Sequence, residues 1–414
     1  MKWTATDKFL LSGVLPVEAG YRRLRDLLDQ SADPIDWSAI SRRAEFHQAA
    51  PLLRFNLFKS KIITLVPESL RTELEGSAQI WAARHLAYVN EAGRLIAAFR
   101  TAGIDSIPLK GAALMLAEFY PQAGLRTAQD LDLLIDPARI EEADSIADKL
   151  GYRELPGRRA IRSRQRLANE INHLWPRRGN SGIIIELHHR AFQFAQNERD
   201  LTYHEIRSRA FKNPLQDGGI VLLPSPSDLA LHLIHHTMVD LQTTHAILRT
   251  FADLHFIFSR NPDAKTGMLA LADELGFGGV ARAASEALNV RSECDLKALD
   301  PRKIPPDQTI LLETALSESP LELAETARLL EYFDFSRRPA TKLANLLSLV
   351  FTSRSHLHQL YGNEISSSTA KGYLRRPFDL MKKFNWKSLQ PKNLIRVRRL
   401  RKMAGKQESP KFKV

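Results

Sequence analysis

This sequence has little cysteine and no long apolar run. The first feature argues against disulfides and cysteine-based zinc sites, and the second argues against a membrane-spanning segment. Among 414 residues there is one cysteine, Cys294, so no disulfide can form within the chain and a four-cysteine zinc site is excluded. Chains without disulfides are typical of reducing compartments. The apolar stretch 343–355 is shorter than the ~20 residues that cross a bilayer. The first residues show no clear cleavage site, so we expect no signal peptide and a cytoplasmic location.

Acidic residues are scarce only at the C-terminal end. The chain carries 59 Lys and Arg against 47 Asp and Glu, a net charge of +12. Residues 371–414 hold 15 of these basic residues and 2 of the acidic ones, so the remainder is close to neutral. Aromatic residues lie between the basic ones, as in segments that bind nucleic acid or an anionic membrane surface. A solvated chain end has the same composition, and the three alternatives stay open.

The remaining composition predicts a soluble globular protein of several parts. A hydrophobic fraction of 44% is normal for such a chain, and its length suggests roughly two or three domains. Apolar periodicity predicts an α+β fold in which a mixed sheet is flanked by helical regions on both sides. The expected parts are an N-terminal helical region (1–100), a core containing the sheet (101–222), a C-terminal helical domain (223–365) and a basic tail (366–414).

Within the core, short apolar runs alternate with amphipathic segments. We expect strands at 105–110, 130–135, 171–178 and 182–190, the last two paired through a turn, and helices at 78–102, 111–120 and 136–151. Gly103 is the expected end of the first of these helices. After Pro224 the pattern becomes helical again.

The segment DLDLLI places two acids in an apolar strand. Because residues i and i+2 of a strand share a face, Asp130 and Asp132 project together while Leu131 and Leu133 point toward the core. Two ionised carboxylates this close repel each other unless a cation lies between them. Oxygen ligands favour Mg²⁺ or Mn²⁺. The pattern therefore predicts a divalent metal site, although a D-x-D pair alone is also common at exposed strand ends.

The strand GIIIELHHR adds a third acid. Glu186 interrupts a β-branched run, and His188 lies on the same face of that strand. If this strand is adjacent to 130–135, Glu186 completes a cluster of three carboxylates that can hold two metals, as in phosphoryl transfer. A salt bridge at a strand end is the alternative role for Glu186.

Upstream, IPLKGAALML reads as a strand that enters a helix at a glycine. Such a junction directs backbone N–H groups toward a bound phosphate, and Lys110 before Gly111 adds positive charge. The pattern is not a Walker A loop. Simple exposure at a strand end is the alternative for Lys110. Arg126, in the following loop, has the alternatives of solvation or pairing with a nearby acid.

Taken together, these pieces resemble the uncharacterised nucleotidyltransferase family of the polymerase-β-like superfamily. The resemblance covers roughly residues 80–260. Its motifs here are Leu109-Lys110-Gly111, Tyr120, Gly124-Leu125-Arg126, Asp130-Leu131-Asp132, the IELHHR strand, LPSPSDLALHLIHH and FADLH. The resemblance implies a nucleotidyltransferase core that moves a nucleoside monophosphate from an NTP to an acceptor, with pyrophosphate released and with Mg²⁺ or Mn²⁺ as cofactor.

The same resemblance implies roles for individual residues. Asp130, Asp132 and Glu186 would be catalytic metal ligands, Gly111 would contact the triphosphate, Lys110 and Arg126 would be phosphate contacts, and His188 would line the site. One departure concerns the phosphate turn. Better-known superfamily members have Gly-Ser or Gly-Gly there, whereas Ala112 follows Gly111 in this chain and supplies no hydroxyl.

The helical half contributes more ambiguous residues. His232, His235 and His236 have spacings that occur in zinc sites, but ordinary core or surface histidines explain them better. The roles of Asp240 and Asp253 are similarly ambiguous, and for Asp253 a structural role is the alternative to a place in the site.

Three functions follow, in order of preference: transfer to a small molecule or protein, RNA-directed transfer that uses the basic tail, and a catalytically inactive nucleotide-binding or scaffold protein of the same fold.

Overall fold

The computed structural model describes most of the chain up to residue 292. The described ranges are 3–14, 18–31, 33–154, 174–179, 182–191, 201–215, 219–239 and 247–292, with the single positions 312, 373 and 395. Cys294, Asp240 and nearly all of the predicted basic tail lie outside them. The predicted roles of that tail are therefore not addressed by the structure.

Four short helices form the N-terminal region. They are α1 (Ala5–Val14), α2 (Glu18–Gln30), α3 (Trp37–Phe46) and α4 (Ala50–Lys59), followed by a 3₁₀ turn, η1 (Ile63–Leu65). Asp36 caps α3, because its side chain accepts a hydrogen bond from the Ala39 backbone N–H at 2.9 Å. Fully buried side chains such as Phe9, Leu10 and Leu53 join these helices to the common core.

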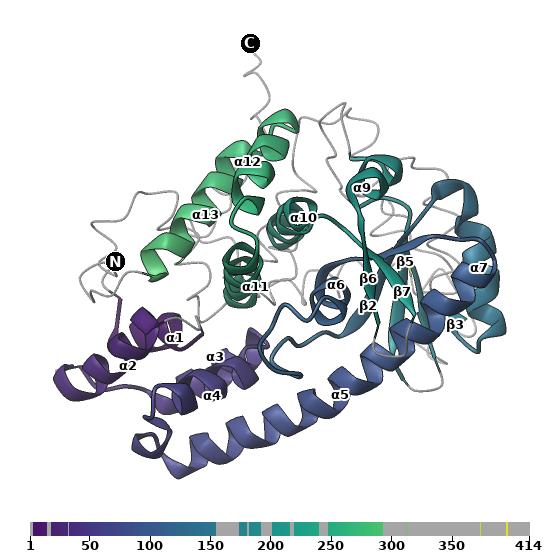
Figure 1. The fold of residues 1–414 in the computed structure, drawn as a ribbon. Coiled ribbons are helices and arrows are strands. Elements are labelled where there is room, and N and C mark those ends of the chain that lie inside the picture. The colour runs from purple at the N-terminus through teal and green to yellow at the C-terminus, as the bar shows by residue number, and fades with distance from the viewer. Residues whose placement is uncertain are drawn as a thin grey trace.

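The helix α5 (Glu68–Thr101) connects this region to the sheet. It has 34 residues and is roughly 50 Å long at 1.5 Å per residue, and in Figure 1 it runs diagonally below the rest of the molecule. The helix expected at 78–102 is confirmed, but it begins ten residues earlier, directly after Pro67. Gly103, with φ of +71°, follows its end as predicted.

The central sheet has five strands in the order β1-β2-β5-β4-β3. Their bounds are β1 (Ser106–Pro108), β2 (Asp130–Ile135), β3 (Arg153–Glu154), β4 (Leu174–Arg178) and β5 (Ile184–His188). The pair β2 and β5 is parallel, and the other neighbours are antiparallel. The predicted pairing of 171–178 with 182–190 is confirmed by β4 and β5. The mixed sheet and the α+β class are likewise confirmed.

Two predicted helices differ from the observed ones at their ends. The helix expected at 111–120 is α6 (Lys110–Leu116), which stops early because Glu118 takes a φ of +52° and the Phe119 N–H bonds back to the Leu114 carbonyl at 3.1 Å. The helix expected at 136–151 starts as a 3₁₀ turn, η2 (Pro137–Arg139), and continues as α7 (Ile140–Lys149).

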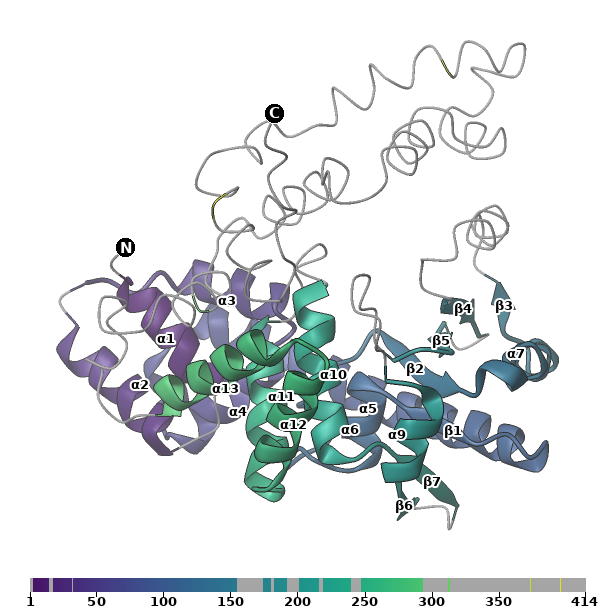
Figure 2. The same ribbon diagram turned by 90° about the horizontal axis from the view of Figure 1, so that it is seen from above.

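The remaining elements are mainly helical. They are α9 (Tyr203–Arg209), β6 (Phe211–Pro214), β7 (Ile220–Leu223), α10 (Pro226–Val239), α11 (Ile247–Arg260), α12 (Ala264–Glu274) and α13 (Gly278–Ser292). The antiparallel pair β6 and β7 was not predicted from the sequence. In Figure 2 the green helices α10 to α13 lie between the purple N-terminal helices and the sheet. Among the described helices, none combines the length and the apolar character needed to cross a membrane.

The predicted domain boundaries fall near breaks between elements. One helix ends at Thr101 and the next strand begins at Ser106, while β7 ends at Leu223 and α10 begins at Pro226. A single hydrophobic cluster nevertheless contains residues from all three described parts. The division into domains therefore stays a prediction.

Candidate active site

Three acids gather on one face of the sheet where β2 and β5 run side by side. The parallel register places Asp132 opposite Glu186, and Asp130 opposite Ile184. On the other face of β2, Leu131 and Leu133 are buried. The structure thus brings Glu186 beside the aspartates, as the sequence predicted. The Asp132 side chain is 1% exposed and that of Glu186 is 15% exposed, so Glu186 is the more accessible of these two.

His188 extends this cluster at the end of β5. Its Nε2 lies 2.7 Å from Asp132 Oδ1 and 3.7 Å from Glu186 Oε2. Burial lowers the pKa of His188 despite the raising effect of Asp132, so at neutral pH the uncharged ring donates its Nε2–H to the carboxylate. Ligand atoms of Asp132, Glu186 and His188 all lie within 4.8 Å of one another. Asp130 is outside that set, which differs from the three-carboxylate ligand group predicted from the sequence.

Lys110 provides the positive charge inside the cluster. Its Nζ lies 2.8 Å from Asp132 Oδ1, the same oxygen that His188 contacts. Burial alone lowers the pKa of Lys110, but the charges of Asp132, Asp130 and Glu186 outweigh burial and raise it above its ordinary value. The Lys110 backbone has a φ of +47°, a region that side-chain-bearing residues rarely adopt. Lys110 therefore combines a strained backbone with a buried ammonium group, and backbone strain of this kind is common at functional sites.

The surroundings shift the pKa values of the two aspartates of β2 in opposite directions. Burial and the charge of Asp132 raise the pKa of Asp130. Burial also acts to raise the pKa of Asp132, but Lys110 and His188 outweigh that effect and hold it well below its usual range. Asp132 is therefore firmly ionised, and the cluster concentrates more negative charge than Lys110 can balance. Such an arrangement attracts a further cation.

The turn that carries Lys110 is held tightly against the strand and the following loop. The Leu109 N–H donates to the Asp132 carbonyl at 2.9 Å. A Cβ on Gly111 would lie 2.9 Å from Ala128 Cβ and 3.2 Å from Arg126 Nη1, so a larger residue has no room there. This packing explains the glycine in the Leu-Lys-Gly motif.

Below this turn, a buried ion pair connects two of the other motifs. Arg126 Nε lies 2.7 Å from Asp253 Oδ1, and the Tyr120 hydroxyl donates to the same oxygen at 2.5 Å. The Arg126 side chain is 4% exposed and that of Asp253 is 1% exposed. Arg126 thus pairs with an acid, which is one of its two sequence-based alternatives, and Asp253 has the structural role expected as its alternative. A phosphate contact by Arg126 stays a prediction.

A second arginine of the site was missed in the sequence. Arg249 on α11 donates to Gln48 Oε1 and approaches the Thr127 carbonyl at 3.4 Å. Burial and the nearby charge of Arg126 lower the pKa of Arg249 to about 10, and Asp130 is among the acids that act on it. Gln48 and Arg249 are 201 positions apart, so no local pattern could have paired them.

The histidines of α10 border the cluster without forming a metal set of their own. His232 and His236 stack with their ring centroids 6.1 Å apart, and His236 acts electrostatically on Asp130 and on His188. His232 and His235 are each 4% exposed. Among the described residues, no group of potential metal ligands includes these histidines. Helix α10 therefore lies beside the cluster, and the interpretation of buried core histidines holds for His232 and His235.

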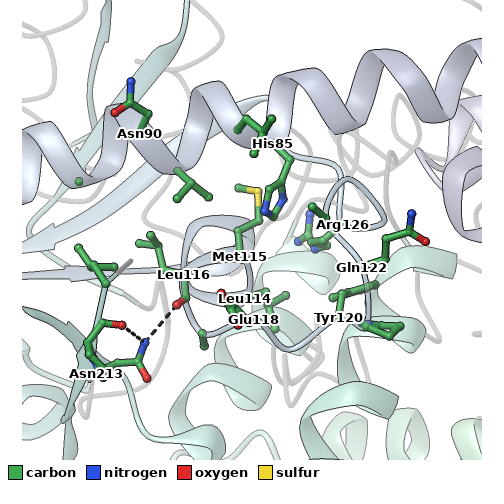
Figure 3. Close-up of a pocket in the computed structure, with 18 of the residues that line it drawn as sticks. His85, Asn90, Leu114, Met115, Leu116, Glu118, Tyr120, Gln122, Arg126 and Asn213 are labelled. Atoms are coloured by element: carbon green, nitrogen blue, oxygen red, sulfur yellow. Dashed lines mark hydrogen bonds between the residues drawn. The ribbon is translucent and has the colours of Figure 1, made fainter. Parts of the chain in front are cut away.

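A cavity of about 870 Å³ lies behind the Lys110 turn, between α5, α6 and β6. Figure 3 shows His85, Met115, Gln122 and Arg126 among its lining residues, with Asn213 donating to the Leu116 carbonyl at 3.2 Å. The acids of β2 and β5 do not line it. Arg126 is the residue common to this cavity and to the packing beneath Gly111.

Comparison with known proteins agrees with the motifs. Residues 33–289 match the family described as uncharacterised nucleotidyltransferase. No curated protein matches the chain. One solved structure, a crystal structure of an antigenic nucleotidyltransferase-like protein from Paracoccidioides brasiliensis, is 14% identical with a TM-score of 0.27, and the match covers 51% of this chain and 95% of that one. Because the family match extends over more than half of the chain, this protein is a nucleotidyltransferase that belongs to the uncharacterised nucleotidyltransferase family.

Proposed function

We propose that this chain moves a nucleoside monophosphate from an NTP to an acceptor hydroxyl, on a small molecule or a protein, in a reaction that depends on a divalent metal. The observation that supports this most strongly is the register that places Asp132 directly opposite Glu186, with Asp130 on the same face. Family membership supports nucleotidyl transfer in general. The metal dependence and the acceptor class belong to the proposal.

The residues present fit a hard divalent cation such as Mg²⁺ or Mn²⁺. Asp132 and Glu186 offer carboxylate oxygens close together, and Asp130 adds charge from the same strand face. When bound, the ion would supply positive charge that offsets the negative charge on the phosphate oxygens. Glu186 is more exposed than Asp132, and we assign to it the position nearest the acceptor hydroxyl, whose proton it would accept.

Lys110 serves two successive partners in this proposal. In the present structure its ammonium group is bound to Asp132 Oδ1 at 2.8 Å and balances part of the charge of the acids. If Asp132 held a divalent ion through this oxygen, Lys110 would have to compete for it and would lose the contact. The ammonium group, on the turn before Gly111, would then be available to the phosphates. This assignment also supplies a cationic contact where Ala112 offers no hydroxyl.

The direct test is to titrate each of the four common NTPs into the protein with Mg²⁺, with Mn²⁺ or with EDTA, and to follow heat of binding and pyrophosphate release. We expect one nucleotide to bind at least about tenfold more tightly with metal, because a bound ion neutralises phosphate charge, and to release pyrophosphate slowly in the absence of an acceptor. Equal affinity with metal and with EDTA for every nucleotide would contradict the proposal. The preferred nucleotide then becomes the labelled donor for an acceptor screen.

Replacement of Lys110 by methionine distinguishes its contact with Asp132 from its proposed contact with the phosphates. We expect Lys110→Met to bind Mn²⁺ at least as tightly as wild type, because the competing ammonium group is gone. It should bind the preferred NTP roughly tenfold or more weakly, since hydrogen bonds to charged groups contribute about 1.5–3 kcal/mol. Lys149→Met, on the exposed surface of α7, is the matched control. Unchanged nucleotide affinity in Lys110→Met would remove Lys110 from the phosphate site.

A further inference from the structure

His188, at the end of β5, lies close to two of the acids in the cluster. In the metal-free structure, His188 Nε2 lies within 2.7 Å of one carboxylate and 3.7 Å of the other. Two ligands that are each about 2.1 Å from one ion are at most about 4.2 Å apart. Both distances from His188 satisfy this limit, and ligand atoms of the three residues all lie within 4.8 Å of one another. With the ring proton on Nδ1 in place of Nε2, the ring and the two acids could therefore hold a single ion after small side-chain shifts.

The oxygen that His188 contacts is informative. A histidine that only orients a carboxylate is expected to use the oxygen directed away from the ion. His188 Nε2 and Lys110 Nζ instead meet at the same atom, Asp132 Oδ1. Lys110 is the cation that contacts this oxygen in the present structure. The carboxylate of Glu186 lies 3.7 Å from the same nitrogen of His188. His188 therefore faces the position in which a metal would replace the ammonium group.

We propose that His188 is a direct ligand of the metal, and that Asp132, Glu186 and His188 form a mixed set of oxygen and nitrogen ligands that favours Mn²⁺ over Mg²⁺. Mg²⁺ prefers oxygen ligands alone, whereas imidazole ligands raise the affinity for first-row transition ions, of which Mn²⁺ also suits carboxylate and phosphate oxygens. The inference rests on the proposed metal-dependent function and names a ligand that the three-carboxylate interpretation omits.

The experiment uses the full chain loaded with Mn²⁺ alone. Pulsed electron paramagnetic resonance detects a ¹⁴N nucleus bonded directly to Mn²⁺, and titration followed by the free Mn²⁺ signal measures the affinity. We expect a ¹⁴N coupling in wild type that is absent in His188→Gln, together with at least about a tenfold loss of Mn²⁺ affinity. Mg²⁺ affinity, measured by competition, should change less than threefold. His204→Gln is the matched control, because the His204 side chain is 75% exposed.

Each other outcome has a distinct meaning. Bound Mn²⁺ without a ¹⁴N coupling in wild type would overturn the ligand assignment and leave the metal-dependent transferase standing. A coupling that persists in His188→Gln would also overturn it, since another histidine would then be the ligand. No Mn²⁺ binding by wild type would overturn both this inference and the proposed metal dependence. The wild-type spectrum is interpretable even if the His188→Gln variant fails to fold.

Discussion

Asp132→Asn is expected to abolish metal-dependent release of pyrophosphate while the chain remains folded. The substitution keeps the shape of the side chain but removes the charge that faces Glu186 across the strand pair. A catalytic metal contributes several kcal/mol to the reaction, and each 1.36 kcal/mol is tenfold in rate. The expected loss is therefore on the order of 1,000-fold, measured as pyrophosphate release with the preferred NTP at saturating Mn²⁺.

A matched control distinguishes the loss of a ligand from a general effect of charge. Asp148→Asn removes a carboxylate whose side chain is 54% exposed and which pairs with Arg153 at 3.0 Å on the surface. We expect wild-type activity from this variant, because exposed pairs contribute little. Far-ultraviolet circular dichroism establishes that both variants are folded. A folded Asp132→Asn chain with activity within tenfold of wild type would exclude Asp132 from the catalytic centre.

Asp253→Ala is expected to cause a large loss of stability at a position far from the sheet in sequence. It removes the carboxylate that binds Arg126 at 2.7 Å and Tyr120 at 2.5 Å, where the arginine side chain is only 4% exposed. When one partner of a buried ion pair is removed, the remaining charge costs about 3–5 kcal/mol. For a folded unit of this size that corresponds to a fall in Tm of roughly 10 °C, measured by thermal and urea unfolding.

Two further variants identify the cause of that loss. Asp273→Ala breaks an ion pair with Arg282 of similar length, 2.8 Å, at an exposed position, and should cost at most about 1 kcal/mol. The double variant Asp253→Ala/Arg126→Met removes both buried charges and should recover part of the stability lost in Asp253→Ala. If the double variant is less stable than the single one by the full cost of a second truncation, the uncompensated charge is not the reason.

The ion pair of Asp253 with Arg126 also lies next to the turn that carries Lys110 and Gly111. Arg126 lies directly beneath Gly111, where an added Cβ would meet its Nη1 at 3.2 Å. Loss of Asp253 frees the guanidinium group to move against this turn. The motifs that contain Tyr120, Arg126 and Asp253 are thus joined in one buried network that packs beneath this turn, and the structure explains their joint presence without requiring that each residue touch a substrate.

Local periodicity was sufficient to predict the two strands that carry the acid cluster. The strand 130–135 was predicted at its observed bounds, because the alternation of acids and leucines reports a buried strand with one polar face. The same alternation placed Glu186 and His188 together on their strand. The C-terminal end of α6 was predicted less well. Glu118 adopts a left-handed backbone conformation there, which its residue type does not predict.

What the sequence by itself determined is therefore the two polar strand faces, the long helix before them and the family to which their motifs belong. Only the tertiary structure decided that β2 and β5 are parallel neighbours in the register that opposes Asp132 and Glu186, and that Lys110 folds back onto those acids. It alone joined Arg126 to Asp253 and Arg249 to Gln48. The physical reason is that these pairings form between distant segments, where the packing of the whole core and the cost of an unpaired buried charge select the partner.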